Sequence, residues 1–169
     1  KEGEVFSTGR HNFCFVKAPM VHWPEVMVSF DTTDGILFSA DAFGKFGVYD
    51  ASPDDWACEA RRYYFNIVGK YGTPVQNVLK KLSSFSIEKI CPLHGPVLTE
   101  NLDYYIGKYI TWSSYAPEDS GVLIAFASIY GNTKKAALFL DEKLKQAGVE
   151  KIVLSDLARS DMAEVIEDA

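Results

Sequence analysis

The chain has 169 residues, of which 24% are charged and 47% hydrophobic, the composition of an ordinary folded protein. A formal net charge of −6 and the lack of any basic run exclude an electrostatic basis for binding nucleic acid or an anionic membrane. No apolar stretch approaches the roughly 18 residues that a membrane-spanning helix needs, and residues 1–8 do not form a charged-then-apolar signal sequence. We therefore expect a cytoplasmic protein.

Three cysteines, Cys14, Cys58 and Cys91, lie far apart in the sequence. Their odd number and wide spacing argue against a disulfide framework and against a CxxC metal or redox motif. We expect reduced thiols that serve in packing.

The first predicted structure is an antiparallel β segment. Apolar runs at residues 13–16, 26–30 and 36–38 are separated by prolines and by an Asp-Gly pair, which are turn signals. The chain begins without Met and inside this segment, so we expect it to be part of a longer protein.

Three helices and a short strand are predicted next. Ser52 supplies an N-cap before Pro53, the apolar spacing from residue 56 to 68 is helical, and the helix should stop near Gly72. The other predicted elements are a helix that starts at Thr73-Pro74, a strand over 88–93 and a helix over 102–113. The last helix carries four aromatic residues that we assign to core packing, namely Tyr104, Tyr105, Tyr109 and Trp112.

The pattern changes after a polar linker at residues 115–120. The continuous apolar run 121–127 is typical of a parallel strand buried on both faces. A helix over 133–147, a strand over 151–154 and a helix capped by Ser160 follow it. This order of elements predicts a β-α-β-α unit.

Three metal-ligating residue types, His22, Asp41 and His94, each lie at the end of a predicted strand or in the loop after it. Imidazole and carboxylate together suit zinc or iron, and rigid strands with convergent loops could bring the three together. Any one alone has a simpler interpretation, because a single histidine is often a surface residue and an aspartate after a strand is often a turn former.

The surrounding residues strengthen the metal interpretation. The segments MVHWP at 20–24, FSADAFG at 38–44 and PLHG at 92–95 closely resemble, in order, three metal-ligand segments of the flavodiiron (A-type flavoprotein) family. The resemblance implies that His22 binds one iron ion, Asp41 bridges two and His94 binds the second. The family's other ligands come from an HxExDH segment that these residues do not contain, so we expect the chain alone to be inactive.

A second constellation lies between the apolar run and the following helix. Hydroxyl and amide side chains around a glycine can form an anion cradle at a helix N-terminus, although a plain turn capped by Asn132 or Thr133 would have the same spacing. The segment lacks the Gly-Lys-Ser/Thr of ATP-binding loops. It resembles the FMN-phosphate loop of flavodoxins, and especially the YGNT version of flavodiiron proteins. The residues that the resemblance assigns to FMN are Ser128, Ile129, Tyr130, Gly131, Asn132 and Thr133.

The resemblance implies an α/β chain with two parts. Residues 1–114 would be the C-terminal part of a metallo-β-lactamase-like αββα di-iron domain, and residues 121–169 the first β-α-β-α of a flavodoxin-like doubly wound sheet. The implied function is reduction of dioxygen to water, or of nitric oxide to nitrous oxide, at a non-haem di-iron centre. Electrons would pass through FMN from rubredoxin or a similar donor, in a head-to-tail homodimer.

Two other functions fit parts of the sequence. A zinc-dependent hydrolase of the metallo-β-lactamase fold could use His22, Asp41 and His94 to hold a nucleophilic water, but it leaves the flavin loop unexplained. A flavodoxin-like electron carrier without catalysis would explain only that loop. Colour and metal content distinguish the three alternatives.

Overall fold

The computed structural model describes residues 2–47 and 53–169, and the chain divides into two compact units, Lys1–Ala116 and Pro117–Ala169. The division falls within the polar stretch 115–120. Within the described residues, no helix combines the length and the apolar character that crossing a membrane requires. Each unit is described by itself below.

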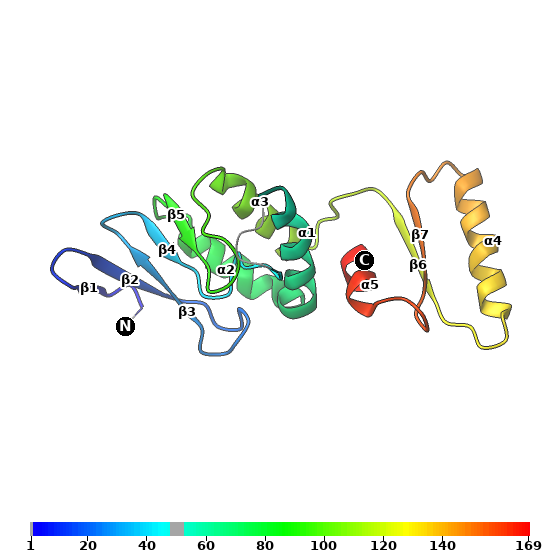
Figure 1. Ribbon diagram of the computed structural model, residues 1–169, viewed down its shortest axis with the longest axis horizontal. Coiled ribbons are helices and arrows are strands. Elements are labelled where there is room, and N and C mark those ends of the chain that lie inside the picture. Colours follow the sequence, from blue (N-terminus) through cyan, green and yellow to red (C-terminus); the bar gives the residue numbers. More distant parts are fainter. Residues whose placement is uncertain (1, 48–52) are drawn as a thin grey trace. The chain divides into compact units, whose positions relative to one another are not determined.

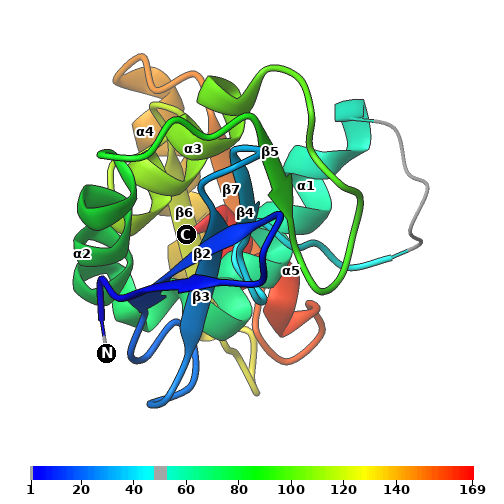
Figure 2. The ribbon, with the colours of Figure 1, turned by 90° about the vertical axis from the view of Figure 1, so that its left-hand side faces the viewer.

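Unit 1 contains a five-stranded sheet with strands in sequence order (Figures 1 and 2). The first four strands pair antiparallel and the fifth pairs parallel to the fourth. The predicted antiparallel segment is thus confirmed, and its first strand is an addition that the apolar pattern did not indicate. The strands are β1 (Val5–Ser7), β2 (Asn12–Lys17), β3 (Met27–Asp31), β4 (Ile36–Phe38) and β5 (Lys89–Cys91).

Three helices lie together on one side of this sheet (Figures 1 and 2). They are α1 (Pro53–Tyr63), α2 (Gly72–Leu82) and α3 (Leu102–Ser113). The predicted helix over 56–68 changes geometry, because α1 continues as a π-helical turn at Tyr64–Val68 and a 3₁₀ turn at Gly69–Tyr71. The expected cap Ser52 lies outside the described residues.

Aromatic side chains dominate the core between the sheet and the helices. Trp56 and Trp112 are fully buried and stack with ring centroids 5.9 Å apart. Tyr105 and Tyr109 are also buried, as expected, whereas Tyr104 is exposed. The expectation that the cysteines pack is wrong for Cys58, whose place on α1 leaves it exposed.

Unit 2 starts with the predicted β-α-β-α order. Strands β6 (Val122–Phe126) and β7 (Ile152–Asp156) are parallel, and α4 (Asn132–Gln146) connects them and packs against both. Helix α5 (Met162–Asp168) follows. Its cap is Asp161 rather than the expected Ser160, because the Asp161 carboxylate accepts a hydrogen bond from the Ala163 N–H at 2.8 Å.

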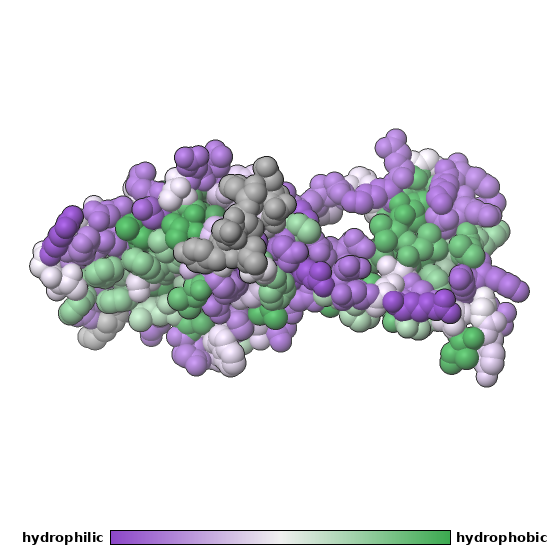
Figure 3. All heavy atoms as spheres, viewed as in Figure 1, coloured by the Kyte–Doolittle hydropathy of each residue, from purple (hydrophilic) through white to green (hydrophobic). Residues whose placement is uncertain are grey.

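The expected burial of β6 on both faces is wrong. Within unit 2, Ile124 is the buried residue of that strand and its neighbours are partly or fully exposed. A two-stranded sheet gives each side chain few neighbouring strands to pack beside, so side chains of both strands stay accessible. Figure 3 shows hydrophobic atoms at the surface over β6 and β7.

Candidate metal centre and phosphate loop

The strand pairing of unit 1 brings three loops to one end of the sheet. His22 lies in the β2–β3 loop, Asp41 follows β4 and His94 follows β5. The end of β2 pairs with the start of β3, which in turn pairs with the end of β4, and the ends of β4 and β5 lie side by side. The fold therefore places all three candidate ligands at the same end of the sheet, although His22 and His94 are 72 positions apart in the sequence (94 − 22).

The three side chains face one another there. The Nε2 atom of His22 lies 3.2 Å from Oδ2 of Asp41, and the Nε2 atom of His94 lies 3.9 Å from the other oxygen, Oδ1. Their side chains are 23%, 26% and 34% exposed in the order His22, Asp41, His94, so the group is reachable from solvent. One carboxylate thus presents a different oxygen to each imidazole.

The backbone beside two of these residues adopts an unusual conformation. Met20, Ala40 and Phe43 have φ angles of 65°, 53° and 64°, in the left-handed region that residues other than glycine rarely adopt. Each such residue costs on the order of 1–3 kcal/mol and persists only where the surrounding structure holds it. Strain of this kind flanks His22 and Asp41, as is common in functional sites.

The orientation of His94 is fixed from three directions. Its Nδ1 lies 3.0 Å from the carbonyl oxygen of Lys45, so the ring donates there and leaves Nε2 free toward Asp41. The Tyr63 ring packs edge-on against the imidazole, with centroids 4.6 Å apart. A methyl group on Gly44 would lie 2.3 Å from Cε1 of His94, so glycine is required for the ring to approach this closely.

Backbone hydrogen bonds tie the loop of Asp41 to the loop of His94. The Leu93 N–H donates to the carbonyl of Ala40 at 2.8 Å, and the Ser39 N–H donates to the carbonyl of Cys91 at 3.2 Å. The buried hydroxyl of Ser39 donates to the carbonyl of Ala42 at 2.7 Å. These hydrogen bonds hold the loop of Asp41 and the loop of His94 together.

Tyr63 is a residue of this site that the sequence pattern does not indicate. Burial raises the pKa of its hydroxyl, and the nearby negative charge of Asp41 raises that pKa further. The hydroxyl therefore stays protonated near the carboxylate at physiological pH. Its place in the middle of a helical pattern carried no signal of this role.

Another group of metal-ligating residue types lies at the opposite end of β3. The donor atoms of His11, Asp31 and Asp34 lie within 4.8 Å of one another. Nδ1 of His11 is 2.7 Å from Asp31, whose other oxygen accepts the N–H of Thr33 at 2.9 Å. These hydrogen bonds account for the group as part of the β3–β4 turn.

The second constellation forms the junction between β6 and α4. The N-cap of α4 is Gly131, with φ of 83°, and no side chain caps the helix. Neither Asn132 nor Thr133 is therefore the N-cap, so the interpretation as a side-chain-capped turn is wrong. Gly131 takes the position because this backbone conformation strains any residue with a Cβ.

Three further features of this junction favour an anion. The hydroxyl of Ser128 is buried and, among the described residues, has no hydrogen-bond partner. The first turn of α4 contains Lys134 and Lys135 and no acidic residue. Backbone N–H groups at a helix N-terminus carry partial positive charge and bind phosphate. The orphaned hydroxyl and the uncapped helix end fit a phosphate group.

Comparison with known proteins gives a consistent result over nearly the whole chain. No family model matches it. Among curated relatives, the anaerobic nitric oxide reductase flavorubredoxin of Vibrio vulnificus is 32% identical over 81% of this chain and 29% of its own length. A putative diflavin flavoprotein A 1 of Nostoc sp. is 30% identical over 99% of this chain and 30% of its own length.

Solved structures agree with these relatives. Rubredoxin oxygen:oxidoreductase of Desulfovibrio gigas matches with a TM-score of 0.90 and 25% identity, over 99% of this chain and 44% of that one. A flavoprotein of Thermotoga maritima matches with a TM-score of 0.86 and 26% identity, again over 99% of this chain and 44% of that one. The chain thus spans less than half the length of each of these proteins. It belongs to the flavodiiron protein family, and it matches one part of the longer family members.

Proposed function

We propose that the protein is a flavodiiron oxidoreductase that reduces dioxygen to water, or nitric oxide to nitrous oxide, with electrons passed through FMN. Residues 1–114 would contribute to a metallo-β-lactamase-like di-iron domain, and residues 121–169 to a flavodoxin-like FMN domain, with 115–120 as the linker. Relatives named as a nitric oxide reductase and as a rubredoxin oxygen:oxidoreductase support both substrates and a rubredoxin-type donor.

The observation that carries this proposal is the orientation of the Asp41 carboxylate. A carboxylate can place one oxygen on each of two cations, and Asp41 has one oxygen toward His22 and the other toward His94. Imidazole nitrogen and carboxylate oxygen are donors that suit iron. His22 and His94 would be terminal ligands of different ions, and Asp41 would bridge them.

The chain's own residues would prepare this site for its substrate. Iron, when bound, supplies the redox chemistry. The hydrogen bond from His94 to the Lys45 carbonyl holds the imidazole with Nε2 toward the metal position. The protonated hydroxyl of Tyr63 lies near Asp41 and adds no negative charge there.

The flavin would be held at the start of α4. Ser128, Asn132 and Thr133 would contact the FMN phosphate together with backbone N–H groups, and Gly131 would form the turn. The buried hydroxyl of Ser128 supports this assignment, because an unpaired polar group in the protein interior is costly unless a ligand pairs with it. Ile129 and Tyr130 are 91% and 90% exposed and would lie beside the bound phosphate.

We further propose a cytoplasmic, head-to-tail homodimer in which the FMN of one subunit serves the iron ions of the other. The experiment is to purify the intact protein, measure iron, zinc and flavin, and follow dioxygen and nitric oxide with gas electrodes. Iron, FMN and gas consumption that stops in Asp41→Ala support the proposal. A colourless zinc protein would support the hydrolase instead, and a yellow protein without metal the electron carrier.

A further inference from the structure

We infer that Tyr109 and Trp56 are positioning residues that hold the bridging Asp41 carboxylate between its two histidines, acting through the backbone of Phe43. This inference rests on the proposed function, because it concerns metal binding at Asp41. Tyr109 and Trp56 each hydrogen-bond to the backbone of Phe43. Both act on the loop that carries Asp41.

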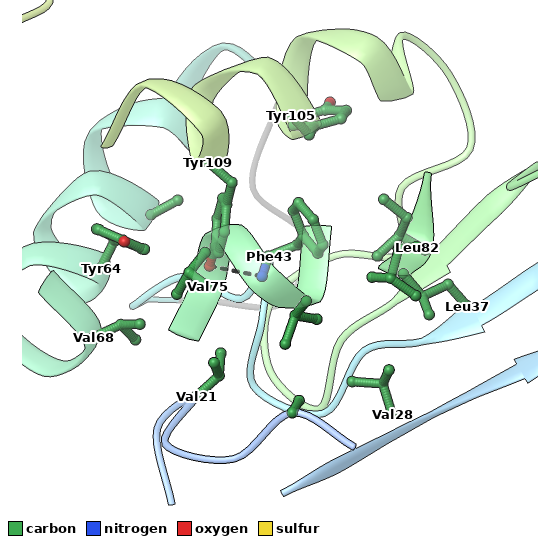
Figure 4. Close-up of a cluster of buried hydrophobic side chains, with 14 of the residues drawn as sticks. Val21, Val28, Leu37, Phe43, Tyr64, Val68, Val75, Leu82, Tyr105 and Tyr109 are labelled. Carbon is green, nitrogen blue, oxygen red and sulfur yellow. Dashed lines mark hydrogen bonds between the residues drawn. The ribbon is translucent and has the colours of Figure 1, made fainter. Parts of the chain in front are cut away.

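Tyr109 and Trp56 bond to the two backbone polar groups of one residue, Phe43. The N–H of Phe43 donates to the hydroxyl of Tyr109 at 2.7 Å, and the indole N–H of Trp56 donates to the carbonyl of Phe43 at 3.1 Å. The Phe43 and Tyr109 rings also pack at a centroid distance of 4.3 Å. Figure 4 shows Tyr109 reaching from its helix to the Phe43 nitrogen.

The conformation of Phe43 explains why it needs these partners. With φ of 64° and 2% exposure, its N–H and carbonyl belong to no helix or strand and are shielded from water. Buried backbone groups must find partners, and here they are two side chains from α1 and α3. Phe43 in turn is two residues from Asp41, whose carbonyl accepts the Gly44 N–H at 3.1 Å. The turn is therefore held at both ends.

The loop of His22 is anchored in the same buried cluster as Phe43. Val21 is 4% exposed and belongs to the buried cluster that contains Phe43 and Tyr109 (Figure 4). One cluster thus supports the residue before His22 and the residue two after Asp41. Disturbing the Tyr109 hydroxyl should move Asp41 relative to His22, while the ring of Tyr109 keeps the core filled.

The chain supplies a matched control within this cluster. Tyr64 is fully buried and its ring lies 5.2 Å from that of Tyr109, but its hydroxyl makes no hydrogen bond of normal geometry within the described part of the chain. Tyr64→Phe therefore removes the same group from the same cluster without releasing the Asp41 loop. Comparing it with Tyr109→Phe separates positioning from a general loss of packing.

The test compares the intact, iron-loaded wild type with two single variants, Tyr109→Phe and Tyr64→Phe. It measures iron affinity by chelator competition, the Mössbauer spectrum of the bound iron, and thermal unfolding. We expect Tyr109→Phe to weaken iron binding about 10- to 100-fold, the usual effect of losing a group that orients a metal ligand. Its spectrum should show altered coupling between the two ions. Tyr64→Phe should leave affinity and spectrum unchanged.

The outcomes are distinguishable. If the wild-type protein binds no iron, the proposed function and this inference both fall. Should the wild type bind iron and Tyr109→Phe bind it equally well with the same spectrum, only the inference is overturned, as it is if both variants lose iron to the same extent. Where Tyr109→Phe does not fold, Trp56→Phe applies the test from the carbonyl side, and unchanged affinity in that variant overturns the inference.

Discussion

The single carboxylate of Asp41 faces two imidazoles, and this sets the charge balance of the candidate centre. Two divalent cations need anionic ligands, and among the three candidate ligands of this chain Asp41 is the anionic one. Loss of either histidine would remove a ligand of one ion, whereas loss of the carboxylate would affect both. The consequences of the substitutions should therefore be unequal.

We predict that Asp41→Ala lowers the iron content of the intact protein more than either His22→Ala or His94→Ala. Elemental analysis of the purified variants measures this. Asp34→Ala is the control, because it removes an aspartate from the His11 group and should retain all iron. An Asp41 variant with wild-type iron would exclude the bridging role.

A second prediction concerns Gly44. In Gly44→Ala the new methyl group would meet the imidazole of His94 at 2.3 Å, so the ring must turn away from Asp41. We expect loss of iron and destabilisation of about 1–3 kcal/mol, as in other overpacked sites. Gly107→Ala on α3 is the control, since nothing lies within 4 Å of its added methyl and alanine favours a helix. Iron titration and urea unfolding of both variants provide the comparison.

At the scale of elements, the junction of β6 and α4 combines a glycine turn with an uncapped helix end. Because no side chain caps α4, its first N–H groups and the lysines beside them attract a negative charge. If acidic side chains are introduced into this junction, the junction should repel a ligand phosphate.

We therefore predict that Asn132→Asp combined with Thr133→Asp weakens FMN binding strongly, through two new like charges at the phosphate position. Fluorescence titration of the flavin into apoprotein measures the affinity. Asn132→Ser with Thr133→Ser keeps neutral polar groups and should bind much better than the charged variant. Equal affinities in the charged variant and the wild type would place the phosphate elsewhere.

The sequence predicted elements well where the local pattern is strong. Helix α3 has the predicted bounds because Leu102–Ser113 has helical spacing throughout, and β4 has the predicted bounds beside its Asp-Gly turn. Strand β1 was missed, since Val5–Ser7 is exposed and is defined by its pairing with β2. The change to π geometry after Tyr63 was also missed, because it breaks no apolar spacing.

The candidate site likewise has residues that local sequence indicates and contacts that it does not. Local sequence indicates His22, Asp41 and His94, and the fold brings them together. Tyr109 acts on Phe43 across 66 positions, and Gly44 matters because His94 packs on it. Such contacts exist only in the tertiary structure, so no local pattern indicates them.

At the scale of the whole molecule, the two candidate sites belong to different units, Lys1–Ala116 and Pro117–Ala169. Each site is built from residues of its own unit, so a substitution in one should leave ligand binding in the other intact. The proposed head-to-tail dimer then requires that electrons cross from the flavin of one subunit to the iron of its partner.

This requirement gives a final prediction, complementation between two inactive variants. Asp41→Ala should lack iron but keep FMN, and Asn132→Asp with Thr133→Asp should lack FMN but keep iron. A mixed dimer has one intact site on each subunit, which suffices if transfer runs between subunits and fails if it runs within one. Random mixing makes half the dimers mixed, each with one working pair, so co-expression should restore about a quarter of wild-type gas consumption. The control is to mix the separately purified, preformed dimers without exchange, which should stay inactive. Mixed dimers that hold one iron-loaded site and one FMN each and are nevertheless inactive would rule out transfer between subunits.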